Sequence, residues 1–208
     1  MLDAVHIPPE EILAILTAVS FAAGLNVYAT ILTIGLLAHA GAFPLPPALH
    51  LLSSWTVIVC SGILFLVELF ADKIPVFDLL WNALHTFVRV PVAALLAYGA
   101  TAQLSPVWQL AATFLGGMIA LAAHSGKTAV RAAVTPHPEP FSNILLSLGE
   151  DALAIFLTWL ATRHPLSATI VSLALVLAAI VLVHWIMRAL RNMLRRARKE
   201  VELLFGGV

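Results

Sequence analysis

The sequence has few charged residues and a single cysteine, and each scarcity excludes a class of protein. Only 11% of its 208 residues are Asp, Glu, Lys or Arg, whereas 61% are hydrophobic. A soluble domain usually has about a quarter charged residues, so this composition predicts an integral membrane protein. The lone Cys60 excludes an intramolecular disulfide, and no basic soluble surface exists to bind nucleic acid. The acidic start, with Asp3 and Glu10, lacks the basic segment of a cleaved signal peptide.

Long apolar runs predict an all-α integral membrane protein with about six transmembrane helices, some of them broken or kinked. The first run, 12–40, is longer than the roughly 20 residues that cross a bilayer. It is interpreted either as one tilted helix or as a helix broken at Gly24, and Asn26 favours a polar interior in both cases. Pro91 should kink or divide the third span. The other five spans are expected at 55–70, 76–99, 107–134, 141–162 and 165–187.

The last segment differs in composition from the rest of the chain. We expect residues 1–187 to form a polytopic membrane domain and residues 188–208 to form a basic amphipathic tail in the cytoplasm. Basic residues near an anionic leaflet contribute about 1 kcal/mol each to membrane binding, so the tail should contact anionic lipid headgroups. Its basic face holds Arg188, Arg191, Arg195 and Arg198.

The distribution of Lys and Arg predicts the orientation of the protein. The loops expected at 41–54 and 100–106 contain no Lys or Arg and the loop near 163–165 holds only Arg163, whereas the opposite side holds Lys73, Lys127 and the basic tail. Cytoplasmic loops of membrane proteins are enriched in Lys and Arg. With six spans, both termini should therefore lie in the cytoplasm and the protein in the bacterial inner membrane.

Polar and ionisable residues gather in the half of the membrane expected to face the cytoplasm. Asp78, Asn82, His85 and Arg89 are spaced so that they form one stripe on a helix. Segments inside a bilayer rarely hold so many ionisable groups unless these line a cavity or pair with one another. Both explanations remain open at this point. The other candidate solute- or ion-binding residues are Asn26, Glu68, Asp72, His124, Lys127, Arg131, Asn143, Glu150 and Asp151.

Motifs for catalysis or metal binding are missing from the sequence. No HExxH or paired-cysteine spacing occurs, so no metal or other cofactor is predicted. Gly126-Lys127-Thr128 resembles the end of a phosphate-binding loop, but Leu121 occupies the position of its first glycine. Ser125 beside His124 does not suffice to define a hydrolase. The sequence therefore leaves enzymatic activity undecided.

The leading hypothesis is a transporter or channel for a small polar or ionic solute, with a polar vestibule open to the cytoplasm. The acids and His85 would bind or relay a cation or proton, and Arg89, Lys127 and Arg131 would balance their charge. A membrane enzyme or a lipid-headgroup-binding protein is the first alternative, and a structural scaffold with purely paired charges is the second. A homo-oligomer is also considered, because so small a bundle often needs a partner copy to enclose a path.

Four segments of the chain resemble an uncharacterised family of small bacterial membrane proteins. They are 21–30, 70–75 with Asp78, 85–89, and 138–143 with Glu150 and Asp151. The family is classed as a domain of unknown function, number 4126. The resemblance extends to about residue 160 and implies a polytopic helical membrane protein. It implies no activity and no catalytic residue, and the basic tail lies beyond it.

Overall fold

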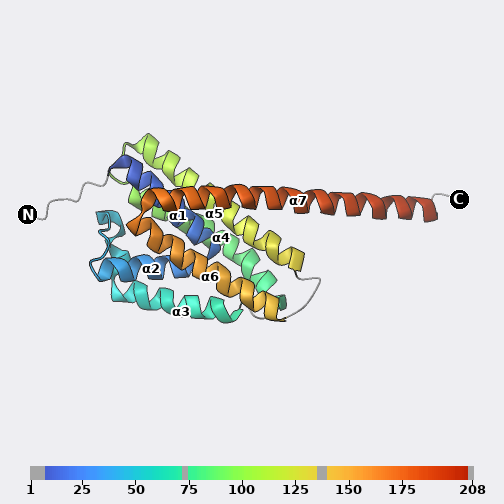
Figure 1. The fold of residues 1–208 in the computed structure, drawn as a ribbon, viewed down its shortest axis with the longest axis horizontal. Coiled ribbons are helices and arrows are strands. Elements are labelled where there is room, and N and C mark those ends of the chain that lie inside the picture. Colours follow the sequence, from blue (N-terminus) through green and yellow to red (C-terminus); the bar gives the residue numbers. More distant parts are fainter. Residues whose placement is uncertain (1–7, 72–74, 135–139, 206–208) are drawn as a thin grey trace, which may run out of the picture.

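The computed structural model describes residues 8–71, 75–134 and 140–205, with the backbone alone at Pro9, 75–80, 132–134, 140–143, 197 and 199–205. The described residues form helices and no strand, which confirms the all-α prediction (Figure 1). The helices are α1 (Pro9–Leu25), α2 (Val27–His39), the short 3₁₀ helix η1 (Pro47–Ser53), α3 (Trp55–Ala71), α4 (Pro75–Ala100), α5 (Pro106–Val134), α6 (Pro140–Arg163) and α7 (Pro165–Phe205).

Proline marks the start of most of these helices. Each of the four helices from α4 to α7 begins with it. The fixed φ of proline suits the first helical turn, where its missing amide proton is not needed. Pro91 lies inside α4, but it does not divide the helix, which continues from Pro75 to Ala100.

Helices α1 and α2 form a hairpin that enters the bundle from one end and returns to it. Asn26 separates them in an extended conformation, with φ −149° and ψ 105°. Ile12 in α1 and Phe43 after α2 line the same pocket, whereas an unbroken helix over 12–40 would separate its ends by roughly 40 Å. The interpretation of one tilted span is therefore wrong, and the broken helix is confirmed, two residues beyond Gly24 (Figure 1).

Helix α1 is the central element of the bundle. Every residue from Leu16 to Val27 is buried, and α1 packs against α4, α5, α6 and α7. A helix break inside a membrane protein is tolerated where other helices, and not lipid, surround it. This packing places the break at Asn26 in the interior of the molecule.

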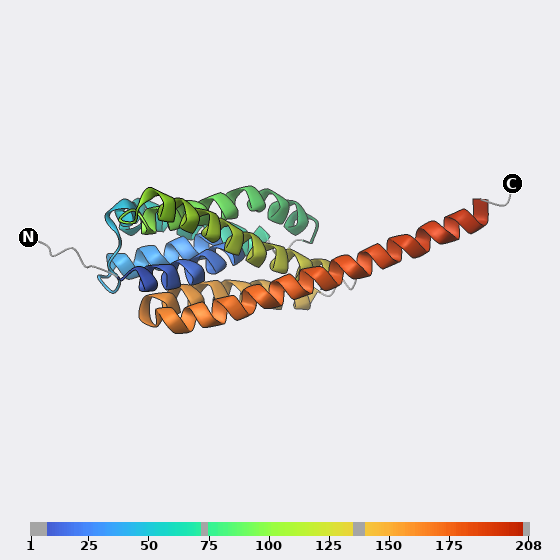
Figure 2. The ribbon, with the colours of Figure 1, turned by 90° about the horizontal axis from the view of Figure 1, so that it is seen from above.

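The two ends of the bundle differ in the segments they hold. We call the end where α1 begins and α2 finishes the hairpin end; it also holds η1 and the turns near Ala100 and Thr162. The opposite end, where α3 and α5 finish and from which α7 projects, is the tail end (Figures 1 and 2). The described chain thus begins at one end and finishes at the other. This differs from the prediction that both termini lie on the same side.

Four helices of the described chain are long and apolar enough to cross a membrane, at 81–100, 106–131, 144–163 and 165–196. A fifth crossing results if η1 and α3, bent by 63°, are counted as one span. The predicted number of six is not confirmed. The reason is the hairpin, since two short helices that return to the same end do not make a crossing.

Helix α7 is the longest element of the fold. It runs without interruption for 41 residues, or about 60 Å, and extends far beyond the other helices (Figures 1 and 2). The expected boundary between membrane domain and tail, at 187–188, lies within this single helix.

Candidate functional site

The helix break is held in place by the Asn26 side chain, which is fully buried. Its oxygen accepts a hydrogen bond from the Ala29 amide at 2.9 Å and so caps the start of α2. Its amide group donates to Asp151 Oδ1 at 2.8 Å. One side chain therefore both starts α2 and ties the tip of the hairpin to α6.

The two helix ends at the break face side chains of complementary charge. The C-terminal end of a helix carries a partial negative charge and the N-terminal end a partial positive one. The Leu25 carbonyl, at the end of α1, accepts a hydrogen bond from Lys127 Nζ at 3.4 Å. The start of α2 is linked through Asn26 to the Asp151 carboxylate. A cation thus lies at the negative end of α1 and an anion beside the positive end of α2.

Lys127 is also the centre of a row of alternating charges, which we call the charge chain: Arg131, Glu150, Lys127, Glu68 and Arg89. Lys127 Nζ lies 3.1 Å from Glu150 Oε2 and 3.8 Å from Glu68 Oε1. Arg131 Nη2 binds the same Glu150 oxygen at 2.8 Å, and Arg89 Nη2 binds Glu68 Oε1. Only Glu150, with 12% of its side chain exposed, has appreciable access to solvent. The charge chain connects α3, α4, α5 and α6 through buried ion pairs.

Arg89 fixes the state of His124. Its Nη1 lies 2.9 Å from His124 Nδ1, and because arginine can only donate, Nδ1 must be the accepting nitrogen. His124 Nε2 then carries the proton and donates to Thr86 Oγ1 at 2.7 Å. Asn82 Oδ1 accepts a longer hydrogen bond from Arg89 at 3.4 Å. Both ring nitrogens of His124 are therefore occupied in this arrangement.

His85 connects α4 to the hairpin. Its Nδ1 lies 2.8 Å from the Trp81 carbonyl and must donate to it, which leaves Nε2 to accept from the Tyr28 hydroxyl at 3.2 Å. Tyr28 belongs to the first turn of α2, so a second polar contact ties the hairpin to its surroundings. Tyr28 and Thr86 were not among the candidate residues. Tyr28 could have been found from its position two residues after Asn26. No feature of the sequence indicated Thr86.

Most of the candidate residues come together in this region. Those that do are Asn26, Glu68, Asn82, His85, Arg89, His124, Lys127, Arg131, Glu150 and Asp151. Asp72 lies outside the described residues. Asp78 and Asn143 lie in α4 and α6, at positions where only the backbone is described. Among the described residues, no three His, Cys, Asp or Glu side chains are grouped so that they could hold a metal ion.

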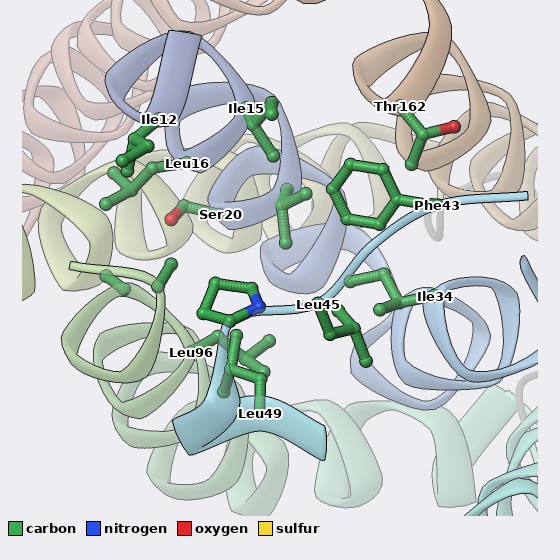
Figure 3. A pocket seen from close by; sticks show the side chains of 14 residues that line it. Ile12, Ile15, Leu16, Ser20, Ile34, Phe43, Leu45, Leu49, Leu96 and Thr162 are labelled. Atoms are coloured by element: carbon green, nitrogen blue, oxygen red, sulfur yellow. The ribbon is translucent and has the colours of Figure 1, made fainter. Parts of the chain in front are cut away.

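A cavity of different character lies towards the hairpin end. It has a volume of about 50 Å³ and is lined mainly by apolar side chains from α1, α2, α4, η1 and the loop before η1. Phe43, Leu45 and Leu49 close one side of it and Leu16 the other (Figure 3). The interior is therefore charged on the tail side of Asn26 and apolar on the hairpin side.

Substituting Asn26 should test its double role. We expect Asn26→Leu to lower the free energy of unfolding by about 2–4 kcal/mol, because it removes a helix cap and a buried hydrogen bond to a charged group. Asn26→Ser, which keeps a capping oxygen but cannot reach Asp151 in the same way, should lose about half as much. Equilibrium unfolding in mixed detergent micelles measures both. Equal losses for the two variants would show that the cap contributes nothing.

These features define a polytopic helical membrane protein with a broken-helix hairpin and a buried charge chain in its core. The chain belongs to the family described as Domain of unknown function (DUF4126), whose profile matches residues 13–185. The match includes the whole charge chain and all of the hairpin except the first residues of α1. No curated protein and no solved structure matches the sequence.

Proposed function

We propose that this protein is a transporter or channel that moves a small polar or ionic solute across the membrane. The observation that carries the proposal is the helix break at Asn26, where the Leu25 carbonyl at the end of α1 accepts from Lys127 and the Asn26 side chain at the start of α2 donates to Asp151. Broken helices of this kind form solute and ion sites in secondary transporters, where helix ends and freed carbonyl groups contact the cargo.

The charge chain supplies groups that can exchange partners when a solute arrives. Lys127 is shared between Glu150 and Glu68 at 3.1 and 3.8 Å. A cation or proton that binds one of these carboxylates would release Lys127 towards the other. The apolar cavity near Phe43 and Leu45 would close the opposite side of the path, since apolar constrictions exclude water and ions.

The orientation that we propose places the tail end in the cytoplasm of a bacterial cell and the protein in the inner membrane. The hairpin-end loops 41–54 and 100–106 contain no Lys or Arg, and the turn after α6 holds only Arg163, whereas Arg131 near the end of α5 and the basic residues from Arg188 to Arg198 in α7 lie towards the other end. This distribution follows the positive-inside rule. The start of α1 then faces the periplasm. The first basic residues after the span, Arg188 and Arg191, then lie near anionic headgroups of the inner leaflet.

A purely structural role for the same residues is the competing explanation. Each described member of the charge chain has a partner of opposite charge, and such pairs could do no more than hold four helices together. Flux measurements separate the two explanations, because a scaffold has no flux to lose.

The test uses the purified protein in liposomes and four probes. These are protons followed with internal pyranine, radioactive rubidium and chloride, and glycerol followed by light scattering. We expect flux of at least one probe above that of empty liposomes, and we expect Glu150→Gln to reduce it to the empty level. Glu10→Gln, an exposed acid at the start of α1, is the matched control and should leave flux unchanged. No flux with any probe, or full flux in Glu150→Gln, would contradict the proposal.

A further inference from the structure

Beyond the tail end of the bundle, α7 carries an apolar stripe that no described residue covers. Leu190, Met193 and Leu194 are 48%, 67% and 62% exposed. The helix that presents them continues without a break from the membrane span, and it stands clear of the other helices (Figures 1 and 2). In water such a stripe needs a partner surface.

The stripe has the spacing of a coiled coil. Val176 and Val183, seven residues apart, are half-buried on the bundle, and Leu190 continues that row outside it. In the sequence the row goes on to Ala197 and Leu204. A second row runs beside it, formed by Met187, Leu194 and Val201. Two rows offset by three and four residues are the a and d positions of a heptad repeat.

We propose that a second copy of this chain covers the stripe, and that the two α7 helices form a parallel coiled coil beyond the membrane, from Met187 to Leu204. Two copies inserted in one membrane have the same orientation, so their tails are parallel, and their confinement to the bilayer raises their effective concentration. Met187, 44% exposed, is the first residue of the stripe after the half-buried Val183.

The charges agree with a parallel pair of identical helices. In this register Met187, Leu194 and Val201 are a positions, and Leu190, Ala197 and Leu204 are d positions. Arg191 and Arg198 are then e positions. The g positions that face them across a parallel seam include Ile186 and Met193. No arginine therefore faces another arginine across the seam. Arg188 and Arg195 lie at b positions, on the outside.

The geometry of α7 argues against a tail that lies flat on the lipid surface. Sharp kinks in helices occur almost always at proline, at glycine or at a π-bulge. The sequence from 166 to 205 contains no proline and no glycine. The helix is uninterrupted over the same range. From the predicted end of the span at Met187, a straight continuation carries residue 205 roughly 25 Å further along the helix axis.

Disulfide cross-linking tests the proposal in native membranes. The single native cysteine is removed first, as Cys60→Ser, and one new cysteine is then introduced by Leu194→Cys, in the seam, or by Asn192→Cys, at the outward f position two residues away. Two cysteines at the same seam position of the paired helices have their Cα atoms within the roughly 4.4–6.8 Å that a disulfide allows. Two cysteines at an outward position are farther apart than this. Oxidation with copper phenanthroline should convert most of the Leu194→Cys protein to a dimer on a non-reducing gel and leave Asn192→Cys monomeric.

Two results would overturn the proposal. One is the absence of a dimer for Leu194→Cys, as expected for a tail on the lipid surface or on another protein. The other is equal cross-linking of both variants, which would reflect random collision. Size-exclusion chromatography before oxidation shows that each variant is folded. The outcome is independent of the flux measurements, because it depends on α7 alone.

Discussion

Replacing Glu68 by leucine should destabilise the protein by about 3–5 kcal/mol, because removal of one partner of a buried ion pair leaves an uncompensated charge. Arg89 is fully buried and its guanidinium binds Glu68 directly. Adding Arg89→Met to the same chain should recover part of the loss, since an apolar pair of similar size no longer contains a buried charge, although His124 and Asn82 then lose the donor that Arg89 supplies. Lys127, which keeps Glu150 as its partner, would remain satisfied.

The geometry of the pair explains why this effect should be large. Glu68 Oε2 and Arg89 Nε have no hydrogen-bond partner among the described residues. They are an acceptor and a donor of the same ion pair, so a small rotation would let them bind each other in a two-pronged arrangement. Such pairs combine charge with fixed geometry, and methionine or lysine at position 89 cannot reproduce them.

Unfolding by detergent titration measures these changes as a double-mutant cycle. Glu11→Leu, which removes an exposed acid from α1, is the control and should change stability by less than about 0.5 kcal/mol. A Glu68→Leu protein as stable as the parent would contradict the prediction. A double variant as unstable as the single one would show that Glu68 acts mainly through another partner.

Gly24→Ala should also destabilise the protein, by about 1–3 kcal/mol, because it forces a methyl group into a packed contact. A Cβ added at Gly24 would lie 2.7 Å from the Ala123 Cβ and 2.8 Å from the Ala120 Cα, and it would also meet the Ala120 carbonyl oxygen. Two of these three atoms belong to the backbone of α5, which cannot turn away as a side chain would. Gly24→Val should cost more again.

The same substitution elsewhere should have the opposite effect. An added Cβ at Gly149, in α6, meets no atom within 4 Å. Alanine is more favourable than glycine in a helix by about 1 kcal/mol, so Gly149→Ala should stabilise the protein slightly. Thermal unfolding of the two alanine variants in detergent compares them directly. Losses of equal size would mean that the close approach of α1 to α5 is not what makes Gly24 necessary.

The sequence predicted the helices well because their determinants are local. Proline marks the helix starts, and apolar runs of sufficient length give the spans of α4 to α7. The spacing of Asn82, His85 and Arg89 placed them on one stripe of a helix, and all three are buried in α4. Such features depend on helical periodicity alone, which a single sequence contains.

The hairpin could not be predicted with the same confidence, because hydrophobicity does not distinguish burial in lipid from burial in protein. The run 12–40 is apolar in either case. Its first half is enclosed by four helices, which is a property of the whole fold. The pairing of charges could not be predicted either. Lys127 lies between Glu68 and Glu150 because of the way α3, α5 and α6 pack.

The central position of α1 has a consequence for biogenesis. This helix leaves the ribosome before the other described helices, yet three of the helices that enclose it, α5, α6 and α7, are synthesised after all the rest of the bundle. Contacts between segments so far apart in sequence form slowly. The hairpin must therefore remain at the translocon or at the bilayer surface until the later helices have been inserted, and only then take its place among them.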